Sequence, residues 1–175
     1  MSISKEIREL VRQRAGCACE FCGVSETDTG GELTLDHYHP HTKGGTDGLE
    51  NLLYCCTRCN LYKHDYFPNA SSDPALWNPR VEPAAKHFLE LEDGSLSPLT
   101  PTGAFTLQRL RLNRPPLVAH RLFKRKSNEE AQLLNRYREL LALLEQVNTQ
   151  LGAVTEEQHS LLEEQQRLLR LLMGR

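Results

Sequence analysis

Apolar residues near the start of the chain recur at intervals of one helical turn. They are Ile3, Ile7, Leu10 and Val11. This spacing predicts a short amphipathic helix that ends at Gly16. A short strand is then predicted at 33–35, and a loop over 40–48 precedes a second hairpin strand. A helix-compatible pattern begins at Asn51 and must end before Pro68, because proline cannot continue a helix. The pattern predicts a strand–strand–helix unit.

The following stretch alternates irregular and regular segments. Residues 69–83 are rich in proline, serine and asparagine, and we expect them to be irregular, with Leu76 and Trp77 packed against the core. The pattern predicts a hairpin over residues 87–96 and a short helix over residues 102–112.

The last third of the chain carries an apolar heptad pattern with alternating spacings of four and three. The seam consists of Leu133, Tyr137, Leu140, Leu144, Val147, Leu151, Val154, Gln158, Leu161, Gln165, Leu168 and Leu172. An unbroken register favours one long helix that pairs in a dimer. Gly152, with a possible capping box at Thr155 and Gln158, favours instead two helices folded as an antiparallel hairpin. In both cases leucines beside the seam, such as Leu134 and Leu141, need burial.

Charge is distributed unevenly, although the net charge is only −2. Residues 94–128 contain no Asp or Glu. Their basic residues are Arg109, Arg111, Arg114, Arg121, Lys124, Arg125 and Lys126. Residues 129–175 are acidic, with eight Glu against five Arg. A basic stretch with no acidic residue favours contact with nucleic acid.

The first residues lack the apolar core of a signal peptide, and no apolar run approaches the roughly 18 residues that a membrane span requires. We therefore expect a cytoplasmic protein with no membrane association. In a reducing compartment, paired cysteines are metal ligands more often than disulfides.

Four of the six cysteines form two Cys-x-x-Cys pairs. The pairs are Cys19/Cys22 and Cys56/Cys59. Two such pairs brought together supply the four sulfur ligands of a tetrahedral structural zinc. Cys17 and Cys55 are interpreted as packing residues.

Between the two pairs lie 33 residues, more than a plain zinc ribbon uses. The informative residues in and after this insert are Asp36-His37-Tyr38-His39-Pro40, Lys43-Gly44-Gly45, Asn51-Leu52, Asn60 and Lys63. Their order and spacing resemble the His-Asn-His (HNH) nuclease motif of the ββα-metal fold. Segments further on resemble the downstream half of bacterial HNH proteins common in cyanobacteria, so that the resemblance covers roughly Glu6 to Arg125.

The resemblance implies a site that hydrolyses phosphodiester bonds. In it His37 takes the proton from the attacking water, and Asp36 and Asn60 ligate Mg²⁺ or Mn²⁺ through oxygen. Asn51 hydrogen-bonds near the His37 ring and fixes its orientation. The family often has histidine where this chain has Asn60, and an amide oxygen suits magnesium or manganese better than soft metals. His64, one turn further on, is the alternative ligand.

Phosphate contacts are expected from six basic residues. They are Arg58, Lys63, Arg109, Arg111, Lys124 and Arg125. His39 and His41 are interpreted as loop residues near the phosphate.

The sequence therefore predicts an α+β fold in three segments. Residues 1–68 form the zinc-clipped nuclease core, residues 69–126 a proline-rich and basic extension, and residues 127–175 a helical segment that pairs in cis or in trans. The expected function is metal-dependent endonuclease on DNA, with RNA as a further possible substrate, in a bacterial defence or mobile-element context. The C-terminal helices are expected to form a homo-oligomer or to bind a partner protein. The alternative is a catalytically silent zinc protein that binds nucleic acid or a partner.

Overall fold

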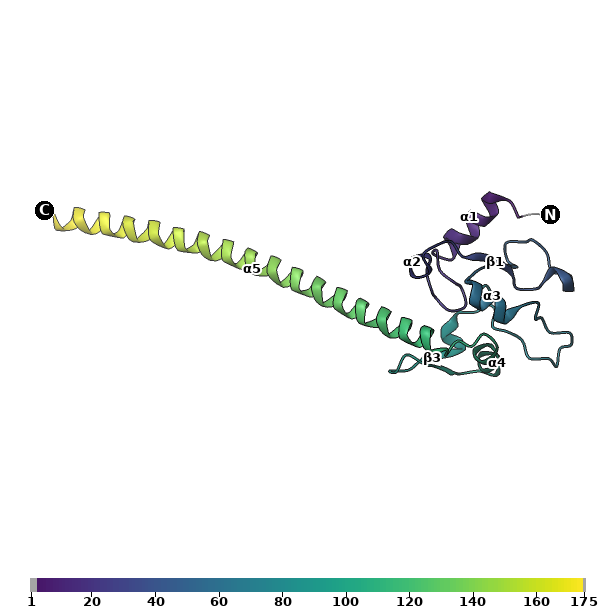
Figure 1. Ribbon diagram of the computed structural model, residues 1–175. Helices are drawn as coiled ribbons and strands as arrows, with labels where there is room; N and C mark the ends of the chain where they lie inside the picture. Colours follow the sequence, from purple (N-terminus) through teal and green to yellow (C-terminus); the bar gives the residue numbers. More distant parts are fainter. Residues whose placement is uncertain (1–2, 175) are drawn as a thin grey trace. The chain divides into compact units, whose positions relative to one another are not determined.

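The computed structural model describes residues 3–174, which fall into two units. The first ends at Lys124 and the second begins at Arg125. The elements of the first unit are small helices and two antiparallel strand pairs, several of which are labelled in Figure 1. This mixture confirms the predicted α+β fold.

Helix α1 (Lys5–Arg14) begins at Ser4, whose hydroxyl accepts a hydrogen bond from the backbone N–H of Ile7. Such a cap satisfies a donor that has no partner within the helix. Val11 on its inner face is fully buried, and Gly16 just beyond the helix has a φ of 61°. The predicted first helix is confirmed. A one-turn helix, α2 (Glu26–Thr29), follows the first cysteine pair.

The central hairpin consists of β1 (Thr34–His37) and β2 (Leu52–Cys55), paired so that His37 lies opposite Leu52. Helix α3 (Thr57–Lys63) follows directly. The strand–strand–helix order is confirmed, but the prediction of a helix from Asn51 is wrong. All four residues of β2 are buried, and a short run that is apolar on both faces has the same pattern in a buried strand as in a buried helix.

The segments after α3 follow the predicted order. Residues 69–83 are irregular, and Leu76 and Trp77 are buried. The second hairpin pairs β3 (Phe88–Glu90) with β4 (Leu96–Pro98), and α4 (Pro101–Arg109) follows. Two short 3₁₀ turns, η1 (His41–Lys43) and η2 (Ala84–Lys86), complete the unit.

One hydrophobic core joins these elements. It includes Val11 of α1, all of β2, Trp77, and Leu110 and Leu112 beyond α4. The residues after position 69 therefore pack on the same core as the cysteine-rich hairpin. This shared core fixes the position of α3 against β1.

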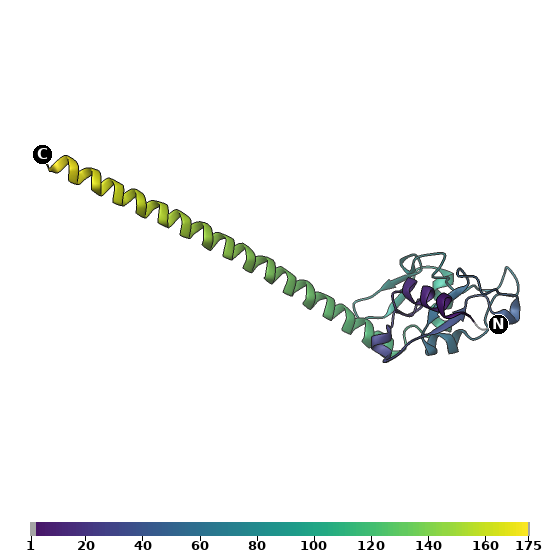
Figure 2. The ribbon, with the colours of Figure 1, turned by 90° about the horizontal axis from the view of Figure 1, so that it is seen from above.

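Helix α5 (Pro115–Met173) is continuous through position 152 (Figure 2), so of the two alternatives the structure has the single long helix and not the hairpin. A glycine inside a helix costs only about 1 kcal/mol relative to alanine. The Thr155 hydroxyl donates to the Leu151 carbonyl at 2.8 Å instead of capping a new helix. None of the helices within residues 3–174 combines the length and the apolar character that a membrane span requires.

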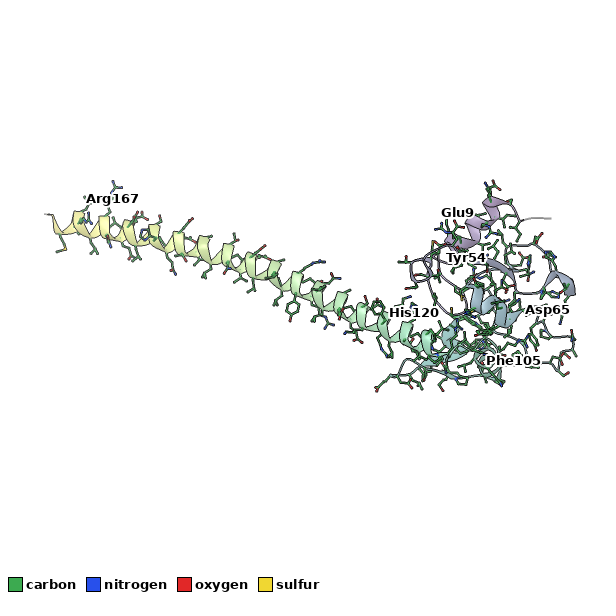
Figure 3. The ribbon with its side chains drawn as sticks, viewed as in Figure 1. Glu9, Tyr54, Asp65, Phe105, His120 and Arg167 are labelled. Carbon is green, nitrogen blue, oxygen red and sulfur yellow. The ribbon has the colours of Figure 1, made fainter. Side chains whose placement is uncertain are left out.

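The second unit, described by itself, consists of the part of α5 that begins at Arg125, with its side chains standing free around it (Figure 3). The apolar residues of the heptad seam keep between 50% and 76% of their surface exposed. This face has no partner among the residues that the structure describes.

Candidate active site and metal centre

The two cysteine pairs meet at the junction of β2 and α3. The sulfurs of Cys19, Cys22, Cys56 and Cys59 all lie within 4.8 Å of one another, and the Cys22 and Cys56 sulfurs are 3.7 Å apart. Four sulfurs placed tetrahedrally around zinc at about 2.3 Å are about 3.8 Å from each other. The four residues therefore fit a structural zinc, as the sequence predicted.

Electrostatics of the cluster also favour a cation. Hydrogen bonds from the neighbouring thiols, that of Cys22 first, hold the pKa of Cys19 well below its usual range. The contact with Cys19 raises the pKa of Cys59, because a second thiolate beside the first is repelled. Four thiolates are compatible only when a cation lies between them. Cys17 and Cys55 are not part of this group.

A second centre lies in a hollow of about 360 Å³ between the end of β1 and the outer face of α3. The hollow is lined by Asp36, His37, Pro40, His41, Thr42, Thr57, Asn60, Leu61, His64 and Asp65. Asp36 and His37 come from β1, and Asn60 comes from α3. The zinc-clipped junction thus brings the predicted base and the two predicted oxygen ligands to one cavity.

His37 is held by Asp47, a residue that the sequence analysis did not identify. The His37 Nε2 lies 2.8 Å from Asp47 Oδ1, and the same oxygen lies 2.7 Å from His41 Nε2. Hydrogen bonds from His37 and then His41 lower the pKa of Asp47, which is therefore a carboxylate at neutral pH. A carboxylate can only accept, so Nε2 carries the hydrogen and Nδ1 of His37 keeps its lone pair.

The prediction that Asn51 contacts the His37 ring is wrong. Its Oδ1 accepts from the His39 N–H at 2.7 Å, and its Nδ2 donates to the carbonyls of His39 and Thr46 at 3.0 and 2.7 Å. Asn51 therefore fastens the two ends of the loop that carries His41. A β-carbon at Gly45 would lie 1.7 Å from the His39 carbonyl oxygen, so the loop requires glycine there.

Lys63 is buried, and the prediction that it contacts phosphate is wrong. Its side chain has no exposed surface. Its Nζ donates to the His37 carbonyl at 2.6 Å and lies 3.1 Å from Asp36 Oδ2. Burial raises the pKa of Asp36, and the lysine charge opposes that shift. Lys63 thus anchors the end of β1 to α3 and supplies the positive charge beside Asp36.

The oxygen donors in the hollow fit a hard cation. Asp36 Oδ2 is buried and accepts no hydrogen bond despite the nearby lysine. Asn60 donates through Nδ2 to Thr34 Oγ1 at 3.4 Å, which leaves its carbonyl oxygen available. Carboxylate and amide oxygens are suitable ligands for magnesium or manganese. His64 lines the same hollow but pairs through Nδ1 with Asp65.

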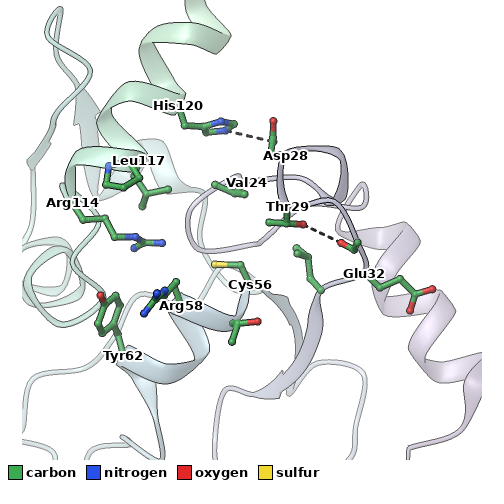
Figure 4. Close-up of a pocket in the computed structure, with 14 residues that line it drawn as sticks. Val24, Asp28, Thr29, Glu32, Cys56, Arg58, Tyr62, Arg114, Leu117 and His120 are labelled. Carbon is green, nitrogen blue, oxygen red and sulfur yellow. Dashed lines mark hydrogen bonds and ion pairs between the residues drawn. The ribbon is translucent and has the colours of Figure 1, made fainter.

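Three of the remaining predicted phosphate contacts, Arg58, Arg109 and Arg111, lie on or beside α3. Arg58 is exposed and lines a pocket of about 740 Å³ beside Cys56, into which Arg114 also projects (Figure 4). Arg109 lies over the Tyr66 ring at 4.5 Å, and Arg111 lies over the Tyr62 ring at 5.0 Å. These two arginines line a further hollow of about 640 Å³ that shares Leu61 and His64 with the hollow beside His37. Lys124 is exposed at the end of the first unit, and Arg125 begins the second.

The roles of two residues of the site, Asp47 and Lys63, could not have been predicted from the sequence alone. Asp47 is the only acidic residue between His37 and Gly48, but only the folded loop shows that it returns to the ring. Lys63 belongs to the predicted motif, yet its burial follows from how α3 packs on β1.

Comparison with known proteins agrees with this geometry. The family model described as HNH endonuclease matches residues 19–66, a span that contains both cysteine pairs and every residue that lines the hollow beside His37. No curated protein and no solved structure matches the chain.

Proposed function

From the match of residues 19–66 to the HNH endonuclease model we propose that the protein is a metal-dependent endonuclease that hydrolyses phosphodiester bonds of DNA. The observation that carries the proposal is the meeting of Asp36, His37 and Asn60 in one hollow beside a four-cysteine cluster. A scaffold role alone would require the cysteines but not these three residues.

In the proposed reaction, Nδ1 of His37 takes the proton of the attacking water. Asp47 holds Nε2 at 2.8 Å and stabilises the imidazolium that forms. Asp36 and Asn60 would hold a magnesium or manganese ion, which supplies positive charge to the phosphate oxygens as negative charge accumulates on them. Lys63 fixes the backbone of His37 by donating to its carbonyl.

Basic residues around α3 support nucleic acid as the substrate. Arg58 and Arg111 carry charge without an ion pair to a described acidic residue, and guanidinium groups bind phosphates. Lys124 belongs to the basic stretch of the sequence. Arg109 and Arg125 extend the same basic segment. We propose DNA as the main substrate. RNA has the same phosphodiester link and is tested alongside.

The heptad seam of α5 supports assembly with a second copy of the chain. Gln158 and Gln165 occupy equivalent seam positions. In a parallel, in-register pair each glutamine meets its own counterpart, whose amide satisfies it. A dimer would carry two sites and could cut both strands, whereas a single chain would nick. Sedimentation equilibrium tests this, and a monomer at micromolar concentration would refute it.

One observation favours the alternative, a silent protein that binds nucleic acid or a partner. Lys63 already provides the charge that a metal would provide to Asp36. A role in bacterial defence or in a mobile element stays a proposal that the neighbouring genes would test.

The decisive experiment incubates the full chain with supercoiled plasmid, single-stranded DNA and RNA, with and without added Mg²⁺ or Mn²⁺. Omission of the added metal is preferable to a strong chelator, which would also compete for the structural zinc. We expect metal-dependent cleavage that falls by about 10²-fold or more in His37→Ala.

His159→Ala is the matched control, because this histidine is exposed on α5 and lies in the other unit. It should cleave like the wild type. Cleavage by His37→Ala at the wild-type rate would refute the assignment of the base. Binding without cleavage under every condition would favour the silent alternative.

A further inference from the structure

A second group of metal-binding atoms is formed by His37 and the loop that follows it, and it does not include Asp36 or Asn60. It comprises Nε2 of His37, Nε2 of His41 and a carboxylate oxygen of Asp47, all within 4.8 Å of one another. The two imidazole nitrogens approach the same oxygen, at 2.8 and 2.7 Å. The two rings lie 4.2 Å apart between centroids. Two histidines converging on one carboxylate is more than the orientation of a single base requires.

The donor set selects a particular class of cation. Two imidazole nitrogens and one carboxylate oxygen suit zinc and neighbouring transition metals, whereas magnesium prefers oxygen donors and keeps its waters. The His41 side chain is 52% exposed and that of Asp47 is 39% exposed. A cation could therefore enter from solvent, and a fourth position would be left for water.

The geometry is close to what such a cation needs. Tetrahedral ligands at about 2.0–2.1 Å from zinc lie about 3.3 Å from each other. The present contacts of 2.7 and 2.8 Å would have to lengthen by about half an ångström. His41 lies in the exposed turn η1, so a small shift of this turn would suffice. Asn51 would continue to hold the loop at His39 and Thr46.

We propose that His37, His41 and Asp47 form a binding site for a borderline divalent cation, with zinc as the representative, and that occupation of this site switches off the base. The second half of the proposal rests on the proposed function, whereas the binding itself does not. Nothing in the predicted magnesium site requires His41 or Asp47 as a ligand.

The switch follows from the two nitrogens of one ring. Without the cation, Nε2 of His37 carries the hydrogen and Nδ1 has the lone pair that accepts a proton from water. A cation bound through the Nε2 lone pair leaves the ring hydrogen on Nδ1. The net charge of the ring is unchanged, and the hydrogen moves from one nitrogen to the other through solvent. His37 then has no lone pair for the attacking water.

Binding is measured on the full chain with its cysteine site already loaded with zinc. Zinc chloride is titrated by calorimetry in the presence of excess magnesium, and cobalt replaces zinc in a parallel spectroscopic titration. We expect one further ion per chain, with cobalt absorption that lacks the thiolate-to-metal bands of a cysteine site. In His41→Ala the affinity of this ion should fall by at least about tenfold.

His64→Ala is the matched control, because His64 lines the same hollow but is not one of the three ligands. It should bind the further ion like the wild type. Zinc content and the melting temperature of each variant check that the cysteine site and the fold persist. Failure to bind a further ion at micromolar zinc would overturn the proposal, as would equal binding by His41→Ala or loss of binding in His64→Ala.

Cleavage assays separate the two parts of the proposal, the binding of the cation and its effect on the base. Micromolar zinc should inhibit magnesium-dependent cleavage by the wild type, and His41→Ala should cleave in magnesium yet resist that inhibition by at least about tenfold in zinc concentration. Equal inhibition of His41→Ala would overturn the switch and locate the block elsewhere, at Asp36 and Asn60. A further ion that depends on His41, in a chain that cleaves nothing, would support the metal site and refute the proposed nuclease function.

Discussion

Replacement of Lys63 by methionine tests how the catalytic hollow is held together. The change keeps most of the apolar stem and removes the ammonium group. Asp36 then loses the cation 3.1 Å from its carboxylate, and the His37 carbonyl loses its donor at 2.6 Å. Leaving one partner of a buried ion pair without the other costs about 3–5 kcal/mol. Asp36 keeps 11% of its side chain exposed at the hollow, so we expect the lower end, a loss of about 3 kcal/mol in the free energy of unfolding.

The loss should depend on pH in a defined direction. Burial already holds the pKa of Asp36 above its ordinary value, and removal of Lys63 raises that pKa further. A carboxyl whose pKa is raised on folding destabilises the fold above that pKa and ceases to do so when it is protonated. The deficit of Lys63→Met should therefore be full at neutral pH and shrink as the pH falls through the raised pKa of Asp36.

Urea denaturation of both proteins, followed by tryptophan fluorescence at several pH values, measures this difference. Arg58→Met is the matched control, because Arg58 lies on the exposed face of the same helix; its change should stay within about 0.5 kcal/mol. Manganese should stabilise Lys63→Met more than the wild type, because Asp36 then lacks its lysine partner. A Lys63→Met protein as stable as the wild type at neutral pH would refute the reasoning.

Three further predictions concern other parts of the chain. Asp47→Asn should lower the single-turnover cleavage rate by about 10- to 100-fold with little change in substrate affinity, because the neutral amide stabilises the His37 imidazolium less; an unchanged rate would contradict this. The contact with Arg12 lowers the pKa of Glu26 to about 2, so this pair stabilises the fold above the ordinary value of 4.5 and the stabilisation is lost as the pH falls through about 2. The melting temperature of Glu26→Gln should therefore change less with pH between 4.5 and about 2 than that of the wild type. An equal pH dependence in the two proteins would contradict the stabilising role of the pair. Gly152→Ala should stabilise helix α5 by about 1 kcal/mol in thermal melts followed by circular dichroism. A variant with less helical signal than the wild type would indicate that the helix ends at Gly152.

The meeting of the four cysteines, and that of Asp36, His37 and Asn60 in one hollow, could be predicted because the sequence signals for both are local. Cys-x-x-Cys spacing fixes how two sulfurs approach one ion, and adjacent residues at a strand end such as Asp36 and His37 stay together in any fold that forms the strand. The same holds for Asn60, which lies one residue after Cys59 and so has its place in α3 set by the cysteine pair.

The remaining features depend on contacts between distant segments. The sequence pattern could not separate a buried strand at 52–55 from the start of a helix, because burial on both faces removes the alternation that marks a strand. The return of Asp47 to His37 depends on the loop fastened by Asn51, and the burial of Lys63 depends on the packing of α3 against β1. At Gly152 the local signals for a break were real but weaker than the continuous hydrogen bonding of α5.

Chemical rescue of His37→Ala measures the central claim most directly. Single-turnover cleavage of a labelled DNA oligonucleotide is followed in magnesium, with and without free imidazole in the buffer, for His37→Ala and for Asp36→Ala. If His37 is the base beside a cation held by Asp36 and Asn60, imidazole should restore part of the cleavage in His37→Ala and none in Asp36→Ala. Wild-type cleavage by His37→Ala without imidazole, or equal rescue of both variants, would contradict the account.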